Sequence, residues 1–119
     1  MIDRKLEEKI VEYNKKEAKL LTLTESLAQM KAQLVEVERT LEELSSYSEP
    51  YVYKLQGGIL IKVETQKAKE DLEKMKALLS SRISSMEKEV DSLSQVLERL
   101  RKALEAELQQ YQQGPHGGA

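Results

Sequence analysis

Residues 51–63 read Tyr-Val-Tyr-Lys-Leu-Gln-Gly-Gly-Ile-Leu-Ile-Lys-Val, and this stretch decides the fold. Two runs rich in β-branched, aromatic and aliphatic residues flank the pair Gly57-Gly58, and glycine tolerates the positive φ that a tight hairpin turn requires. The pattern predicts a β-hairpin. Because two isolated strands bury too little surface to be stable in water and leave both outer edges unpaired, we expect the hairpin to assemble with other strands.

Side chains on a strand alternate between two faces, so a turn of even length assigns each hairpin residue to one face. One face is expected to carry Val52, Lys54, Ile59, Ile61 and Val63, and the other Tyr51, Tyr53, Leu55, Leu60 and Lys62. Both faces are largely apolar, which favours cover on both sides, as in a sandwich or barrel. The alternative is a hairpin that folds back on the helices of its own chain. The expected assembly residues are Tyr51, Val52, Tyr53, Leu55, Gly57, Gly58, Ile59, Leu60, Ile61 and Val63.

Heptad patterns lie on both sides of the hairpin. Steps of four and three residues trace a first seam, broken by two lysines, through Ile2, Leu6, Lys9, Tyr13, Lys16, Leu20, Leu23, Leu27, Met30, Leu34, Val37, Leu41 and Leu44. A second seam runs through Ala68, Leu72, Met75, Leu79, Ile83, Met86, Val90, Leu93, Leu97, Leu100, Leu104, Glu107 and Tyr111. Two consecutive steps of four between Met75 and Ile83 mark a stutter, which locally unwinds a supercoil. Such long seams predict coiled-coil helices.

Capping and helix-breaking residues mark the helix ends. Asp3 is a candidate N-cap for a helix over about 3–45, which ends before Pro50. Thr65 is a candidate N-cap for a second helix over about 65–113, which Gly114 and Pro115 end. The linker and hairpin then cover about 46–64, a flexible tail covers 114–119, and residues 1–119 form one domain. We expect a mostly α fold in which the two helices pair as an antiparallel coiled coil within one chain.

The composition favours a coiled coil over a globular core. The 119 residues include no tryptophan or phenylalanine, 34% are charged, and the formal net charge is -2. Residues 2–20 hold six basic and five acidic residues, whereas the alternative of an arm that grips RNA would need a basic stripe. The chain has no cysteine and no apolar run of the roughly 20 residues that a membrane span needs. We expect a cytoplasmic protein that binds neither nucleic acid nor membrane.

No residue set predicts catalysis, a metal site or a cofactor. A Ser-His-Asp set or a cysteine nucleophile cannot be assembled, and the carboxylates alternate with lysines as solvated helix faces. His116, the single histidine, lies in a glycine-rich tail without partner ligands. The pair Gly57-Gly58 lacks the following helix N-terminus that a phosphate site uses. We therefore expect no enzyme.

The helix ends remote from the hairpin are the candidate site for binding other polypeptides. Lys9, Lys16 and Glu107 replace apolar seam residues there, so these turns should separate more easily than those near the hairpin. Antiparallel pairing should also bring Lys9 and Glu107 together. The expected client-binding residues are those that separation would expose, Ile2, Leu6, Leu104 and Tyr111, and those that should already face solvent, Ile10, Val11 and Leu108. The alternative is ordinary scattered surface apolar residues.

The chain resembles archaeal β-type subunits of the prefoldin family in the order of its parts. These are a helix, a linker, Tyr53-Lys54, a glycine turn, Ile59-Leu60-Ile61-Lys62-Val63 and a second helix. A single hairpin matches the β type, since α-type subunits carry two. The resemblance implies a hexamer of two α-type and four β-type subunits whose hairpins form a β-barrel platform. It also implies an ATP-independent holdase chaperone that binds unfolded polypeptides at its coiled-coil tips and delivers them to a group II chaperonin. The alternative function is a structural or tethering coiled-coil hairpin without client binding.

Overall fold

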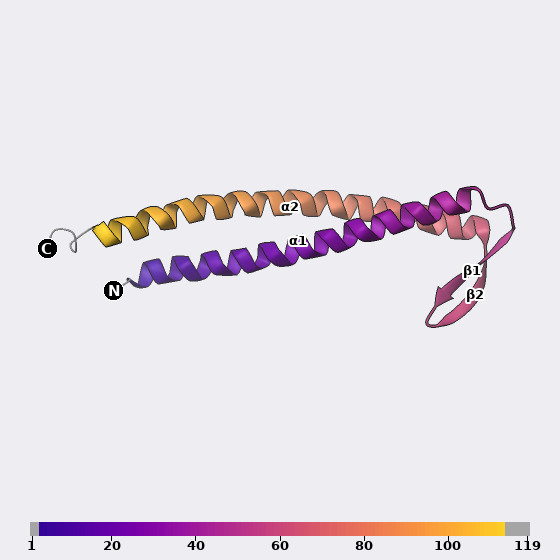
Figure 1. The fold of residues 1–119 in the computed structure, drawn as a ribbon, viewed down its shortest axis with the longest axis horizontal. Helices are drawn as coiled ribbons and strands as arrows, with labels where there is room; N and C mark the ends of the chain where they lie inside the picture. The colour runs from indigo at the N-terminus through magenta and orange to yellow at the C-terminus, as the bar shows by residue number, and fades with distance from the viewer. Residues whose placement is uncertain (1–2, 114–119) are drawn as a thin grey trace. The chain divides into compact units, whose positions relative to one another are not determined.

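The computed structural model describes residues 3–113, so the expected tail, His116 and Ile2 lie outside the described residues. The elements follow in the order α1 (Arg4–Ser45), β1 (Tyr51–Gln56), β2 (Ile59–Glu64) and α2 (Thr65–Gln113) (Figure 1). The predicted arrangement of two long helices joined by a single hairpin is therefore confirmed. Within the described range, neither helix contains a stretch long and apolar enough to cross a membrane.

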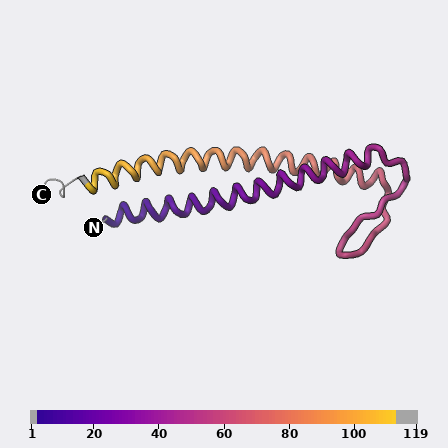
Figure 2. The backbone as a smooth tube through the Cα atoms, viewed as in Figure 1, coloured from indigo at the N-terminus to yellow at the C-terminus, as the bar shows by residue number. Residues whose placement is uncertain are grey.

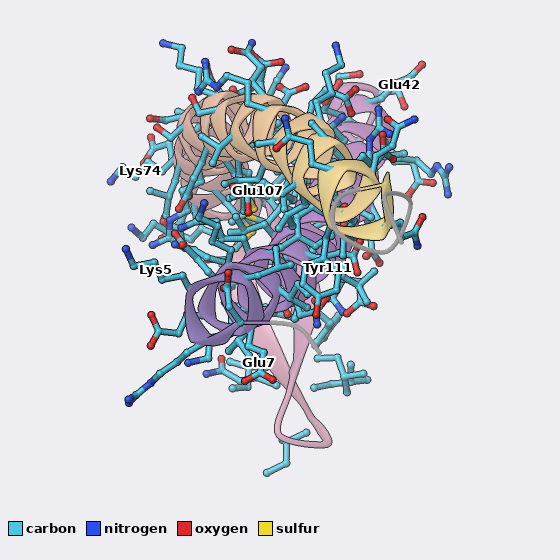
Figure 3. The ribbon with its side chains drawn as sticks, turned by 90° about the vertical axis from the view of Figure 1, so that its left-hand side faces the viewer. Lys5, Glu7, Glu42, Lys74, Glu107 and Tyr111 are labelled. Atoms are coloured by element: carbon cyan, nitrogen blue, oxygen red, sulfur yellow. The ribbon has the colours of Figure 1, made fainter. Side chains whose placement is uncertain are left out.

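The chain divides into two compact units. We call residues 3–26 and 86–113 the terminal unit, and residues 27–85 the hairpin unit. The terminal unit contains the first turns of α1 and the last turns of α2, which lie side by side in antiparallel orientation (Figures 1 and 3). The hairpin unit contains the rest of both helices, the linker and the two strands.

Helix α1 begins at a side-chain cap. The Asp3 carboxylate oxygen Oδ1 accepts a hydrogen bond of 2.7 Å from the backbone N–H of Leu6. This bond satisfies one of the N–H groups that the first helical turn leaves without an intrahelical partner. The predicted N-cap is therefore confirmed.

The heptad seams form the core of both units. In the terminal unit the most deeply buried seam residues are Leu6, Leu97 and Leu104, and in the hairpin unit they are Val37, Leu79 and Ile83. Every other seam position within residues 3–113 is half-buried, except Lys9 and Met75, which are exposed. Met75 stands where the stutter begins, and two successive steps of four rotate a residue away from the line of the seam.

The hairpin has the predicted register. Strands β1 and β2 pair antiparallel with Leu55 opposite Leu60 and Val52 opposite Val63, which assigns residues to the two faces as expected. Gly57 and Gly58 form the tight turn visible in Figure 2, with φ of 59° and 79°. Positive φ at both turn residues matches the right-handed twist of the flanking strands, and glycine adopts it without a steric penalty.

The junction between linker and α2 corrects one prediction. Thr65 is the first residue of α2, and its hydroxyl donates a 2.7 Å hydrogen bond to the backbone carbonyl of Glu49. Its backbone N–H donates to the carbonyl of Pro50 at 2.9 Å, and the residue is buried. The N-cap prediction for Thr65 is therefore wrong, because β2 runs into α2 without a break and the hydroxyl is used to hold the linker against the helix.

Candidate functional site

The hairpin exposes apolar side chains on both of its faces. Leu55 and Leu60 are 69% and 65% exposed on one face, and Ile59 is 66% exposed on the other. Tyr51, Tyr53 and Ile61 are exposed as well. Contiguous exposed apolar surface of this kind marks an interaction site in a soluble protein. The hairpin unit thus has an apolar surface that its own chain leaves uncovered.

The helices cover the hairpin most at its base, the end that joins them. Val52 and Val63 form a directly opposed pair and are half-buried. They line a groove of about 360 Å³ together with Leu44, Leu72 and other residues of both helices. The alternative in which the hairpin folds back on its own helices therefore holds for this end of one face, while Ile59 at the turn end of the same face remains open.

Two of the charged residues that line the groove, Lys67 and Asp71, pair with each other. Lys67 Nζ lies 3.0 Å from Asp71 Oδ1 at the groove wall. The hydrogen bond from Lys67 lowers the pKa of Asp71, assisted by the positive charges of Lys74 and Lys54. The same hydrogen bond raises the pKa of Lys67. Both groups stay ionised and paired near neutral pH, which leaves apolar contact as the main interaction that the groove offers.

A cation–π contact lies on the face of the hairpin opposite to Val52 and Val63. The Lys62 ammonium lies 4.3 Å from the centroid of the Tyr51 ring. The two residues are diagonal neighbours in the β1–β2 ladder, a distance that long and aromatic side chains can bridge. The lysine therefore covers part of an aromatic ring on a face that otherwise exposes Tyr53, Leu55 and Leu60.

In the terminal unit, a charged pair crosses the helix seam. Lys9 Nζ and Glu107 Oε1 are 2.5 Å apart, which confirms the predicted register of the two helices. The hydrogen bond to Glu107 and its negative charge raise the pKa of Lys9. Figure 3 shows Glu107 and Tyr111 on the side of α2 that faces α1, whereas Glu7 points away from α2.

The expected client-binding residues are buried to different degrees. Leu6 and Leu104 are buried, with 3% and 8% of their surface exposed, and Tyr111 is half-buried. Val11 is 51% exposed, as expected for a residue off the seam. Ile2 lies outside the described residues.

Three residues of this set were expected to face solvent, and for two of them the expectation is wrong. Ile10 and Leu108 are both half-buried. Each directly follows a seam residue, Lys9 or Glu107, from which the next seam step is four residues long. This heptad position flanks the seam, where the partner helix covers part of the side chain.

Exposed apolar residues away from the seams were missed in the sequence. On α1, Leu21 and Val35 are 61% and 54% exposed, and on α2 Leu78 is 51% exposed. Leu21 and Val35 each follow a seam residue from which the next seam step is three residues long, and this heptad position faces away from the partner helix. The step length was the available signal in the sequence. Among the described residues, no group of histidine, cysteine and carboxylate side chains could hold a metal ion.

Comparisons with known proteins agree with this architecture. The family model described as prefoldin subunit matches residues 7–111. No curated protein matches the chain. Among solved structures, the fold is similar to the crystal structure of the prefoldin beta subunit from Thermococcus strain KS-1, with a TM-score of 0.77 and 20% sequence identity. That similarity covers 91% of this chain and 96% of the other. The chain therefore belongs to the prefoldin subunit family and has the fold of a β-type subunit.

Proposed function

We propose that this chain is a subunit of an ATP-independent holdase, which assembles through its hairpin and binds unfolded polypeptides at the helix ends of the terminal unit. Prefoldin is a family of chaperones, and membership of that family supports the chaperone role. Further β-type subunits and an α-type subunit are the proposed assembly partners, in a hexamer of two α-type and four β-type subunits. The holdase would act in the cytoplasm and deliver its clients to a group II chaperonin.

One observation carries the assembly part of the proposal, namely the exposure of apolar side chains on both faces of β1 and β2. Leu60 and Ile59 are adjacent residues on opposite faces, and both are about two-thirds exposed. A spacer or tether has no use for such strands, because uncovered apolar edges promote unwanted association. This favours the chaperone subunit over a structural or tethering coiled-coil hairpin without client binding.

Client binding at the helix ends requires local opening. Leu6 and Leu104 are buried in the closed seam, so an unfolded chain would reach them only after the last turns separate. The Lys9–Glu107 pair occupies a seam position that apolar residues would hold more firmly, which lowers the cost of separation. Several weak contacts from different subunits would then combine through their effective concentration.

Removal of the helix ends tests this function. A variant that lacks residues 1–11 and 104–119 should keep the oligomer, because the hairpin is intact, and should lose its suppression of client aggregation. Light scattering by a chemically unfolded client, with and without the assembled protein, measures the protection. ATP should have no effect on it. An assembled truncation variant that protects as well as the intact protein would move client binding away from the helix ends.

A further inference from the structure

A lysine interrupts the apolar strand face that contains Ile59 and Ile61. Lys54 lies directly opposite Ile61 in the β1–β2 ladder, and Ile59 is its diagonal neighbour. The two isoleucines are 66% and 42% exposed, and the lysine is exposed too. Directly opposed residues of an antiparallel pair have Cβ atoms about 4.5 to 5.5 Å apart. A partner that covers the isoleucines therefore covers Lys54 as well.

The chain itself does not neutralise this lysine. The nearby carboxylate of Asp71 is paired with Lys67 at 3.0 Å. The pKa of Asp71 is lowered chiefly by the hydrogen bond from Lys67, and the charge of Lys54 contributes least among the three lysines around it. Within residues 3–113, no carboxylate forms an ion pair with Lys54. The groove lined by these two lysines and one aspartate thus carries one surplus positive charge.

The second lysine of the hairpin has a partner within the chain. Lys62 lies on the opposite face, and its ammonium is 4.3 Å from the centroid of the Tyr51 ring. An aromatic ring attracts a cation through the negative potential of its face. Lys62 is therefore a matched control for Lys54, because both are exposed lysines of the same hairpin and only one has an attractive contact in its own chain.

Assembly would place another side chain next to Lys54. Within the described range the sheet has two strands, so the outer edge of β1 can accept a strand from another subunit. A strand added there puts a residue beside Lys54 on the same face. Withdrawal of an ammonium from water is strongly unfavourable unless an opposite charge replaces the lost hydration. An aspartate or glutamate is the residue that meets this requirement.

A second copy of the chain has no such residue in its strands at this level. Residues 51–63 contain two lysines and no acidic residue. Glu64, the last residue of β2, pairs with Tyr51 and so lies on the face opposite to Lys54. Pairing between the strands of two copies would leave the lysine without a counter-charge, and where two lysines met, their like charges would repel each other.

We propose that the strand which covers Lys54 belongs to a subunit of different sequence and carries an aspartate or glutamate beside this lysine. The inference rests on the proposed assembly through the hairpin and names the neighbour that the hairpin selects. Of the two kinds of partner in that assembly, the α-type subunit is then the neighbour at this edge, and a second copy is disfavoured. Charge complementarity of this kind gives specificity by making the wrong partner unfavourable.

Self-association of the full chain tests the exclusion of a second copy. Analytical ultracentrifugation over a concentration series compares the wild type with Lys54→Leu and Lys62→Leu. Lys54→Leu should self-associate at about tenfold lower concentration than the wild type, because it removes a charge that no strand of a second copy can balance. Lys62→Leu makes the same change of side chain on the other face and should stay close to the wild type.

Charge reversal in the complex tests the predicted carboxylate. Isothermal titration calorimetry measures binding of the full chain to the α-type subunit of the same organism. Lys54→Glu should weaken this binding about tenfold or more, whereas Lys62→Glu should weaken it much less. Each aspartate and glutamate in the strands of the α-type subunit is then replaced in turn by lysine. One of these replacements should restore binding of Lys54→Glu and weaken binding of the wild type. Circular dichroism checks that every variant keeps its helical content.

Four results would overturn the selection by charge. These are wild-type affinity of Lys54→Glu for the α-type subunit, an equal loss in Lys62→Glu, the absence of any restoring replacement, and equal self-association of Lys54→Leu and Lys62→Leu. Light scattering by an unfolded client reads the holdase function separately. If the assembled complex protects the client and Lys54→Glu assembles normally, the inference fails and the proposed function stands. If assembly depends on the charge of Lys54 but the complex protects no client, the inference is supported and the holdase function fails.

Discussion

The strands of the hairpin unit expose their apolar side chains, whereas the helix seam of the terminal unit buries them. Leu55 and Leu60 of the hairpin are more than 60% exposed, whereas Leu6 and Leu104 in the terminal unit are less than 10% exposed. Strands with two open apolar faces suit a permanent interface, which resembles a protein core divided between subunits. A surface that must bind and release many clients is better kept closed or small, because large exposed apolar patches aggregate. This difference is what the proposed separation of assembly from client binding requires.

The two units also differ in what fills the seam. In the hairpin unit the seam residues near the strands are aliphatic, and Val37 and Leu79 are buried. In the terminal unit Lys9 and Glu107 take seam positions and pair with each other. Polar seam residues specify register at a cost in stability, so the terminal unit should be the less stable part of the coiled coil.

The greatest loss of assembly is expected from charges placed on the hairpin. The double substitution Ile59→Asp and Ile61→Asp places two charges on one strand face that we expect to be covered by other subunits. Helical content, measured by circular dichroism, should stay nearly unchanged, and the oligomer should be lost in analytical ultracentrifugation. Val35→Asp, which puts one such charge on an exposed helical site, should leave the oligomer intact. Retention of the full assembly by the double variant would contradict a role for this face in assembly.

An intermediate effect is expected at the junction that holds the hairpin to α2. Thr65→Val keeps the shape of the buried side chain but removes the hydroxyl that donates to the Glu49 carbonyl. The loss of this hydrogen bond should reduce the free energy of unfolding by about 1 kcal/mol. Thermal or denaturant unfolding measures it, and Thr65→Ser, which keeps the hydroxyl, should recover most of the stability. Equal stability of the valine and serine variants would show that the bond contributes nothing.

Repetitive features of the fold were predictable from the sequence, and single contacts were not. The seams, the Asp3 cap and the Gly57-Gly58 turn each depend on local geometry that residue type and spacing determine. Thr65 was misjudged because its partner, Glu49, lies across the hairpin, so only the folded junction reveals the bond. Ile10 was misjudged because burial beside a seam depends on how closely the partner helix approaches. Leu21 was overlooked because seam analysis sets aside the positions between seams.

The Lys9–Glu107 pair of the terminal unit should make only a small contribution to stability. Glu107→Gln should lower the thermal midpoint slightly at low salt and make no difference at high salt, because mobile ions screen an exposed pair. The reversed pair Lys9→Glu with Glu107→Lys should restore the midpoint. Glu12→Gln, which disrupts a pair within α1, is the control, because its effect on the midpoint should not depend on the seam.

The folded protein raises the pKa of Lys9 above its ordinary value of 10.5, chiefly through the hydrogen bond to Glu107. The contribution of the pair is therefore complete below about pH 10.5 and is lost as the pH rises through the higher folded-state pKa. Wild type and Glu107→Gln should accordingly converge in alkaline solution. A difference that persists at high salt and high pH would mean that Glu107 acts through packing of its aliphatic stem and not through its charge.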